Sequence, residues 1–362
     1  MALIAELRDY RLALASPLVT AHGVVKQREG VLFSISDGVD VGWGEAAPLP
    51  GWSQESLTDS RRTLDSVAPR LAQLDSLGDL RLAAILAELE AQPHARAALA
   101  GAVFDLSSRR QGVSLAGFLR SRFSSASHAS GSPLSRSVLL NGLISHGDPA
   151  KVGAAAAALV AEGVSAVKLK VAAAGPQTDV ARVSAARSAI GDDIELRLDA
   201  NGGWDVETAI STLREMAGCN VAFCEEPTSG IDGIAAVGAA GVVPVAVDES
   251  AATPDDIVAA LKTNMIRVVI VKPQALGGSD LAMSAIALAE DFGATAVVTS
   301  MIDSAVGVAH AAHVAAASLP GQVHGLATSD MLNEDVGPRL GIESGKLILA
   351  DLPGLGVAPS KC

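Results

Sequence analysis

The sequence predicts an α/β fold, a closed parallel barrel of βα units preceded by a second, α+β domain. Two observations predict the barrel: five consecutive apolar runs each end on a charged residue, and these ends recur every 23 to 29 residues. That interval is the length of one strand plus one returning helix. A third observation, a chain of 362 residues with 49% hydrophobic content, leaves room for a core outside the barrel.

The five runs place charged side chains in the order Lys, Asp, Glu, Asp, Lys. They are S-A-V-K-L-K ending at Lys170, I-E-L-R-L-D at Asp199, V-A-F-C-E at Glu225, P-V-A-V-D at Asp248 and R-V-V-I-V-K at Lys272. The carboxyl ends of parallel strands meet at one edge, where barrel enzymes carry their functional groups. We therefore expect one shared site, with three carboxylates and a lysine on either side of them.

The same rhythm continues in both directions. S-V-L-L-N ends at Asn141, T-A-V-V-T-S ends at Ser300, and a weaker run, V-H-G-L-A, lies near residue 325. Eight units starting near residue 136 make a closed barrel. An open doubly wound sheet is the main alternative, and it usually carries a glycine-rich phosphate turn after its first strand. The sequence contains no G-x-G-x-x-G or Walker pattern, which favours the barrel.

The residues before about 130 form the predicted second domain. L-F-S-I-S-D-G-V-D-V-G-W-G-E reads as a hairpin turning at Asp37-Gly38, and residues 57–119 are largely helical in pattern. The Ser-rich segment 121–137 is the expected connection. We divide the chain into an N-terminal domain at 1–130, a barrel at 131–325 and a C-terminal segment at 326–362.

The composition of the chain indicates which classes of binding partner and which cellular location to expect. The net charge of −13 disfavours nucleic acid and anionic membranes. No uncharged apolar run reaches membrane-spanning length, and charges at Glu6, Arg8 and Asp9 do not suit a signal peptide, so we expect a cytoplasmic protein. The three cysteines lack metal-ligand spacing and are interpreted as reduced. The expected partner is a small-molecule carboxylate; homo-oligomer formation is left open.

The residue types indicate the chemistry. Three carboxylates, Asp199, Glu225 and Asp248, suit Mg²⁺, with Mn²⁺ as the alternative ion. Strand alternation points Lys168 and Lys170 to the same interior face. Lys170 is the candidate base for a proton α to a substrate carboxylate, with Lys168 as a nearby cation that lowers its pKa. The competing interpretation makes Lys168 an interior ion-pair partner.

Five motifs resemble, in order, those of the enolase superfamily in its muconate-cycloisomerase-like branch. They are K-L-K at 168–170, L-R-L-D-A-N at 196–201, C-E-E-P at 224–227, V-D-E-S at 247–250 and V-K-P at 271–273. The resemblance implies a modified (β/α)8 barrel of (β/α)7β form, capped by a domain built from both termini. It implies that Lys170 is the base, that Lys272 is a lysine opposite it, and that the three carboxylates bind Mg²⁺.

The resemblance also implies two mobile loops, about 15–28 and 47–54, that close over substrate. His22 lies in the first loop and Trp52 in the second, and either is a candidate substrate contact. Glu226 and Glu249 directly follow ligands and so point the other way, which makes them candidates to support the ligands rather than to bind the metal. Arg197, His310 and His313 are interpreted as packing residues.

Within the superfamily, G-W-G-E-A-A-P-L-P-G-W-S-Q-E-S at 42–56 is most similar to o-succinylbenzoate synthases. These are carbon–oxygen lyases that dehydrate 2-succinyl-6-hydroxy-2,4-cyclohexadiene-1-carboxylate, through an enediolate, in menaquinone biosynthesis. N-acylamino-acid racemases, dipeptide epimerases and muconate cycloisomerases are the alternatives. Racemase-capable relatives often carry arginine where this chain has Ala275, and no clear D-x-D epimerase motif follows; both features favour the synthase. Asp303 departs from the synthase pattern, which often has glutamate there.

Two further classes compete. A non-catalytic metal- or ligand-binding barrel would not need the lysine pair, and a Schiff-base lysine aldolase would need neither the carboxylates nor a metal.

Overall fold

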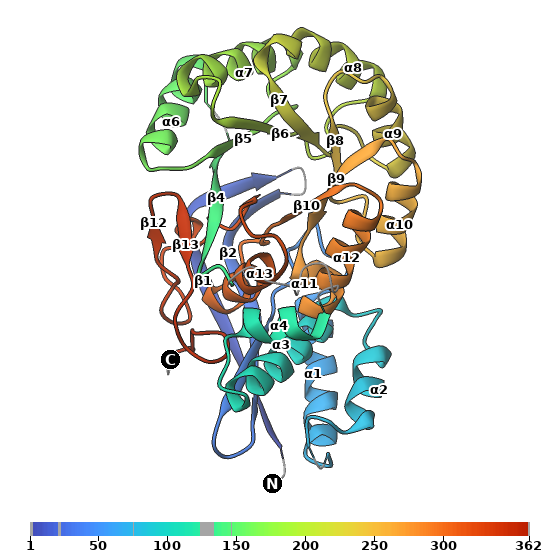
Figure 1. Cartoon of the computed structure of the whole chain (residues 1–362), viewed down its shortest axis with the longest axis vertical. Coiled ribbons are helices and arrows are strands. Elements are labelled where there is room, and N and C mark those ends of the chain that lie inside the picture. Colours follow the sequence, from blue (N-terminus) through green and yellow to red (C-terminus); the bar gives the residue numbers. More distant parts are fainter. Residues whose placement is uncertain (1–2, 21–22, 75, 124–133, 146, 361–362) are drawn as a thin grey trace.

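The computed structural model describes residues 3–20, 23–74, 76–123, 134–145 and 147–360. It consists of an eight-stranded parallel barrel and a cap of antiparallel strands and helices (Figure 1). In Figure 1 the helices α6 to α10 arch around the outside of the barrel strands, and α1 to α4 lie together below them.

The cap begins with three antiparallel strands. They are β1 (Ile4–Thr20), β2 (Gly23–Ser36) and β3 (Val41–Ala46), in the order β1-β2-β3. The hairpin predicted at Asp37-Gly38 is confirmed: Asp37 Oδ1 accepts from the N–H groups of Val39 and Asp40, and Gly38 has φ 89°. These two N–H groups lower the pKa of Asp37 to about 2.

The described residues of the cap also include four helices, in agreement with the helical pattern predicted over 57–119. They are α1 (Leu57–Leu71), α2 (Leu80–Glu88), α3 (Pro93–Arg110) and α4 (Leu115–Phe123). Helix α3 packs directly on β3 at Gly42 and Gly44. A Cβ on Gly44 would stand 1.9 Å from the carbonyl oxygen of Ala98, so only glycine permits this approach. The Ser-rich connection lies partly outside the described residues.

The barrel has eight parallel strands and seven returning helical connections. Its strands are β4 (Ser137–Ile144), β5 (Ala166–Lys170), β6 (Glu195–Asp199), β7 (Val221–Glu225), β8 (Val245–Val247), β9 (Ile266–Val271), β10 (Thr295–Val298) and β11 (Val323–His324). Its helices are α6 (Pro149–Ala161), α7 (Pro176–Ile190), α8 (Val206–Glu215), η1 (Ala217–Cys219), α9 (Ile231–Ala239), α10 (Pro254–Lys262), α11 (Pro273–Leu276), α12 (Ser279–Asp291) and α13 (Ala305–Ser318).

The sheet closes on itself. β4 to β10 pair in sequence order, β11 pairs with β4, and a parallel bridge joins Thr299 beyond β10 to Gly325 beyond β11. The modified (β/α)7β barrel is therefore confirmed, and the open doubly wound sheet is wrong. Within the described residues, no helix is long and apolar enough to cross a membrane.

The segment after residue 325 contacts both parts of the chain. It contains η2 (Ser329–Met331), β12 (Ile342–Glu343) and β13 (Lys346–Ile348), and β13 pairs with β4 of the barrel. Leu332 bridges to Leu14 of the cap, and the Leu355 N–H donates to Asp105 of α3. The boundaries at 130 and 325 stay a prediction.

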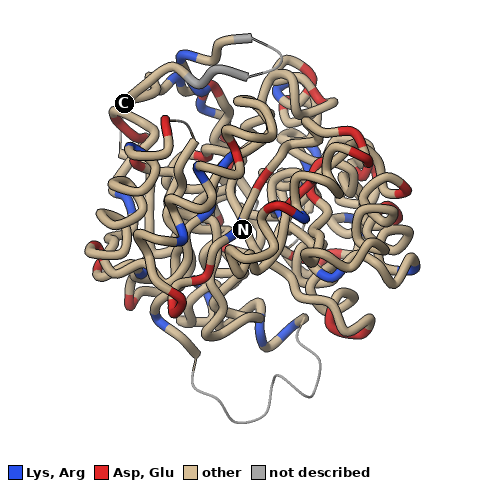
Figure 2. Tube along the Cα trace, turned by 90° about the horizontal axis from the view of Figure 1, so that it is seen from above, with Lys and Arg blue, Asp and Glu red and all other residues tan. Residues whose placement is uncertain are grey.

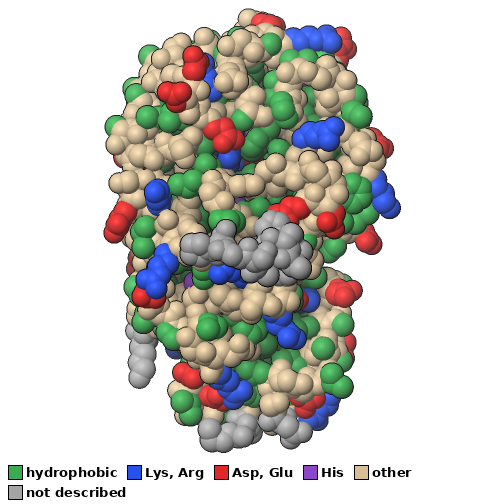
Figure 3. Space-filling view, viewed as in Figure 1, with side chains coloured by type: hydrophobic (Ala, Val, Ile, Leu, Met, Phe, Trp, Pro, Cys, Tyr) green, Lys and Arg blue, Asp and Glu red, His purple; other side chains and the backbone are tan. Residues whose placement is uncertain are grey.

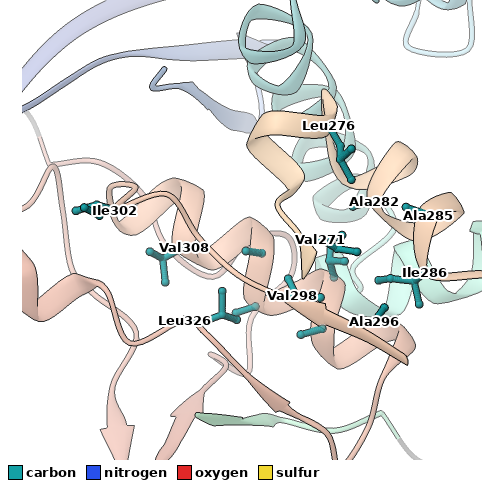
Figure 4. Packing of buried hydrophobic residues seen from close by; sticks show 14 of the residues in the cluster. Val271, Leu276, Ala282, Ala285, Ile286, Ala296, Val298, Ile302, Val308 and Leu326 are labelled. Atoms are coloured by element: carbon teal, nitrogen blue, oxygen red, sulfur yellow. The ribbon is translucent and has the colours of Figure 1, made fainter. Parts of the chain in front are cut away.

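Buried aliphatic side chains fill the space between the strands and the helices. Figure 4 shows Val271 and Val298 at the carboxyl ends of β9 and β10, together with Ile286 of α12. Such packing holds the strand ends, and hence any side chain on them, in fixed positions. Lys and Arg are dispersed among Asp and Glu over the trace in Figure 2, and the charged side chains are scattered over the face in Figure 3.

Candidate active site

The five charged residues meet at the carboxyl ends of five adjacent strands. Lys170, Asp199 and Glu225 are the last residues of β5, β6 and β7, while Asp248 and Lys272 directly follow β8 and β9. In a ring of eight strands, β5 and β9 are four places apart. The two lysines therefore start from opposite walls of the barrel, with the three carboxylates on the strands between them.

Ion pairs connect the lysines to the carboxylates. Lys168 Nζ lies 2.8 Å from Asp199 Oδ2 and 2.7 Å from Glu225 Oε1. Lys170 Nζ lies 2.7 Å from the same Asp199 oxygen, and Lys272 Nζ lies 2.6 Å from Asp248. Lys168 is thus an interior ion-pair partner, as the competing interpretation held. A carboxylate oxygen lies between it and Lys170.

Burial and charge shift the pKa values of these groups in opposite directions. Burial alone lowers the pKa of Lys168, but Asp199 and Glu225 outweigh burial, and the pKa lies above its usual value. Burial raises the pKa of Asp199, and the ammonium groups of Lys168 and Lys170 reverse this, so the pKa is lowered. Burial and the adjacent Asp199 charge raise the pKa of Glu225 well above its usual value. Lys168 therefore remains a cation and is unsuited to accept a proton.

The carboxylates fit a divalent cation by their chemistry. Among the described residues, no three acidic, histidine or cysteine side chains form a ready-made cage for a metal ion. Three carboxylates on adjacent strand ends are nevertheless the oxygen donors that Mg²⁺ prefers. Burial, followed by the charge of Asp199, raises the pKa of Glu225, and a bound cation would oppose both effects. The metal roles of Asp199, Glu225 and Asp248 stay a prediction.

A hydrogen-bond chain links Lys170 to the cap. Lys170 Nζ donates to Asn201 Oδ1 at 2.6 Å, and Asn201 Nδ2 donates to Glu249 Oε1 at 2.9 Å. Trp52 Nε1, from the 47–54 loop, donates to the same Glu249 oxygen at 3.3 Å. Sequence reasoning gave Asn201 no role, although it lies two residues after Asp199 in the quoted L-R-L-D-A-N motif.

The expected direction of Glu249 is wrong, because it accepts from Asn201 beside Lys170, and this contact fits its expected supporting role. β8 ends at Val247, so the alternation of a strand no longer applies at residue 249. Glu226 does serve the backbone beside the site: its carboxylate accepts from the N–H groups of Asp248 and Ser250. Glu226 has φ 41°, and burial raises its pKa to about 7.

The segment 15–28 is one of the two expected mobile loops, and its mobility stays a prediction. Its described residues form the paired ends of β1 and β2, with a register shift between Ala13 and Leu18. His22 lies outside the described residues. The segment 47–54 is irregular, with the Trp52 and Ser53 N–H groups bonded to the Leu49 carbonyl, and its closure over substrate stays a prediction.

Three residues interpreted as packing residues are confirmed as such. Arg197 lies over the Phe223 ring and donates to the Val323 carbonyl, while His310 Nε2 and His313 Nε2 contact the carbonyls of Trp43 and Leu355. Asp303 lies five residues beyond the end of β10 and is 1% exposed, and burial followed by the charge of Glu45 raises its pKa to about 7.

Comparison with protein families identifies the class. Residues 151–361 match the family described as Enolase C-terminal domain-like, and residues 3–79 match the family described as MenC, N-terminal domain. The fold and the site together define an enzyme of the enolase superfamily. The first match spans more than half of the chain, so the chain belongs to the Enolase C-terminal domain-like family.

Individual relatives divide between two activities. An o-succinylbenzoate synthase of Thermobifida fusca (strain YX) is 37% identical over 186 residues, 50% of this chain and 57% of that protein. The chain thus matches little more than half of that relative's length. An L-Ala-D/L-Glu epimerase of Bacillus subtilis (strain 168) is 29% identical over 313 residues, 84% of this chain and 81% of that protein.

Two solved structures of epimerases share the fold of this chain. A substrate-liganded complex of the Bacillus subtilis L-Ala-D/L-Glu epimerase superposes with a TM-score of 0.88 at 27% identity, covering 100% of both chains. A dipeptide epimerase from Cytophaga hutchinsonii, complexed with Mg and dipeptide D-Ala-L-Val, has a TM-score of 0.87 at 26% identity. It covers 100% of this chain and 97% of that chain.

Proposed function

We propose that this protein is an o-succinylbenzoate synthase that dehydrates 2-succinyl-6-hydroxy-2,4-cyclohexadiene-1-carboxylate with the help of Mg²⁺. The observation that carries this proposal is the placement of Lys170 and Lys272 on opposite walls of the barrel, with three buried carboxylates on the strands between them. This arrangement suits removal of a proton α to a carboxylate, because cations can surround the negative charge that develops.

The choice of the synthase within the superfamily has separate support. The cap matches a MenC N-terminal family over residues 3–79, and a synthase is among the most similar relatives. Ala275 lies in α11, three residues after Lys272, where racemase-capable relatives often carry arginine. Dehydration needs one proton acceptor, and Lys170 supplies it.

In the proposed reaction, the neutral amine of Lys170 takes the proton from the carbon α to the ring carboxylate. The electron pair of that C–H bond forms the enediolate, and its collapse expels hydroxide from the neighbouring carbon. Lys170 returns its proton to this hydroxide, so water leaves and the ring becomes aromatic. Lys272 stays protonated and stabilises the enediolate charge without transferring a proton.

Asp199, Glu225 and Asp248 would hold the Mg²⁺ in this account, with Mn²⁺ as the alternative ion. When bound, the ion supplies positive charge against the substrate carboxylate. Lys168 lies between two of these carboxylates and limits the negative charge that the site presents. Glu226 fixes the backbone of Asp248 through its N–H group.

Epimerisation or racemisation of an N-acyl amino acid or dipeptide is the second candidate. The near full-length similarity to the Bacillus subtilis epimerase and the presence of Lys272 opposite Lys170 favour it. Such a reaction needs both lysines, because one removes the proton from one face and the other returns it to the opposite face.

Lys272→Arg separates the two candidates. Arginine keeps the positive charge but is too basic to accept a proton near neutral pH. A synthase should retain dehydration, at a rate reduced only by altered geometry, whereas an epimerase should lose deuterium exchange from one stereoisomer. Lys262→Arg, at an exposed position in the last turn of α10, is the matched control. Loss of dehydration in Lys272→Arg to the level of Lys170→Ala would contradict the single-base mechanism.

A further inference from the structure

Arg28 of β2 is a buried arginine with neither a salt bridge to a carboxylate nor a solvent-exposed head group in the described part of the chain. It is 1% exposed, and its guanidinium donates three hydrogen bonds to backbone carbonyls. Nη2 lies 2.6 Å from the Ala47 oxygen, Nη1 lies 3.1 Å from the Pro48 oxygen, and Nε lies 3.0 Å from the Ile302 oxygen. One side chain therefore joins three chain segments.

Two of the acceptors begin the loop that reaches the site. Ala47 and Pro48 lead into the turn at Leu49, whose carbonyl accepts from Trp52 and Ser53. Trp52 then donates to Glu249, which accepts from Asn201 beside Lys170. The bonds from Arg28 thus fix the start of a segment whose tip is three hydrogen bonds away from Lys170.

The third acceptor is the carbonyl of Ile302, which belongs to the barrel. Ile302 follows the carboxyl end of β10 and has φ 61°, a conformation that is strained for a β-branched residue. Such a conformation persists only when surrounding contacts hold it. Arg28 supplies one of these contacts from 274 residues away in the chain, and so fixes the barrel segment between Met301 and Asp303.

The shape of the guanidinium suits this task. Its planar fork directs several N–H groups at fixed angles, whereas lysine offers a single flexible ammonium group. The three hydrogen-bond acceptors are neutral carbonyls, and the charge of the guanidinium also acts on the buried Asp303. Arg28→Lys therefore keeps the charge and removes the geometry.

We propose that Arg28 is a positioning residue: it sets the 47–54 loop and the strained Ile302 segment around the site and thereby determines substrate affinity. This inference rests on the proposed location of the site and applies whichever of the two reactions the site performs. Arg28 alone would then couple the 47–54 loop to the barrel segment at Ile302.

The chain offers a matched control in Arg187. This arginine is 8% exposed and also donates to backbone carbonyls, among them those of Cys219 at 2.8 Å, Ile194 at 2.8 Å and Asn220 at 3.0 Å. Ile194 and Asn220 directly precede β6 and β7, at the end of the barrel opposite the site. Arg187→Lys should lower stability without altering the site.

The test compares Arg28→Lys, Arg28→Met and Arg187→Lys by amide hydrogen exchange and by steady-state kinetics. In the Arg28 variants, exchange at Trp52 and Ser53 should speed up about tenfold and KM should rise about tenfold, with kcat changed less than about threefold. Arg187→Lys should show neither local effect. Exchange needs no turnover, so its result stands even if the proposed reaction is wrong.

Three results would overturn the inference. They are wild-type exchange and KM in Arg28→Lys, an equal rise of KM in Arg187→Lys, and loss of the folded state in Arg28→Lys. The last result would show an overall structural role in place of a local one. If only Arg28→Met fails to fold, Arg28→Lys decides.

Discussion

The ammonium group of Lys168 lies 2.8 Å from Asp199 Oδ2, an oxygen of one of the three candidate metal ligands. It also contacts Glu225, so one lysine compensates two buried carboxylates. The lysine and a metal ion would therefore act on the same negative charge.

Lys168→Met should make folding depend on a divalent cation. Removing one partner from a buried ion pair costs about 3–5 kcal/mol, because the remaining charge is left uncompensated. Mg²⁺ can replace the missing positive charge, so adding it should raise the melting temperature more for the variant than for the wild type. Thermal unfolding with and without Mg²⁺ measures this. An equal increase in both proteins would contradict the idea that the lysine and the ion compensate the same negative charge.

Asp248→Asn should lower the affinity for Mg²⁺ and the activity by orders of magnitude while the protein stays folded. The substitution removes a charged oxygen ligand with little change of volume. Calorimetric titration gives the affinity, and circular dichroism checks the fold. The control is Asp148→Asn at the exposed N-cap of α6, where asparagine caps equally well. Full turnover of the wild type after exhaustive EDTA treatment would rule out the metal.

Trp52→Phe should raise KM about tenfold with a smaller change of kcat, because Glu249 then loses a hydrogen-bond donor from the cap. Trp43→Phe is the control: Trp43 packs against Arg8 in the cap. If the 47–54 segment closes over substrate, Mg²⁺ plus a product-like carboxylate should also protect it from proteolysis in the wild type. Unchanged cleavage with ligand bound would show that the segment does not close.

The contribution of Asp303 to the free energy of unfolding should fall as the pH rises towards 7. Burial, followed by the charge of Glu45, raises its pKa from 3.8 to about 7. As the pH rises, the unfolded chain loses this proton first, so the contribution of Asp303 to stability falls between about pH 4 and about pH 7. Asp303→Asn cannot ionise and should lose less stability over that interval in urea titrations.

Asp37 provides the control of opposite sign for this pH experiment. Its pKa is lowered to about 2, so its contribution to stability is lost only as the pH falls below about 4. Asp37→Asn should therefore leave the interval from about pH 4 to about pH 7 unchanged. If Asp303→Asn follows the wild type throughout, Asp303 does not titrate as described.

The barrel and the positions of the five charged residues could be predicted because each of five apolar runs ends in a charged residue, at regular intervals along the chain. Lys272 and Asp199 are visible in this way from sequence alone. The ion-pair partners of Lys168 could not be predicted from sequence. Whether its ammonium group lies against the carboxylates or beside Lys170 depends on side-chain geometry inside the barrel. The direction of Glu249 was missed because nothing in V-D-E-S marks the end of β8 at Val247.

Arg28 shows a second limit of the sequence. A single arginine in a β-strand normally faces solvent, and its acceptors at Ala47 and Ile302 are backbone atoms that no side-chain pattern reveals. The strand pairing within residues 15–28 could not be predicted, because it depends on the register of two long strands.

The central claim is that the wild-type protein dehydrates the hydroxycyclohexadiene carboxylate at the site between Lys170 and Lys272. The most direct measurement follows the ultraviolet absorbance of that substrate with purified protein and Mg²⁺, beside deuterium exchange into N-succinyl amino acids and dipeptides. We expect rapid loss of the substrate with formation of the aromatic product, abolished in Lys170→Ala. Robust epimerisation of dipeptides or N-succinyl amino acids with no detectable dehydration would contradict the claim.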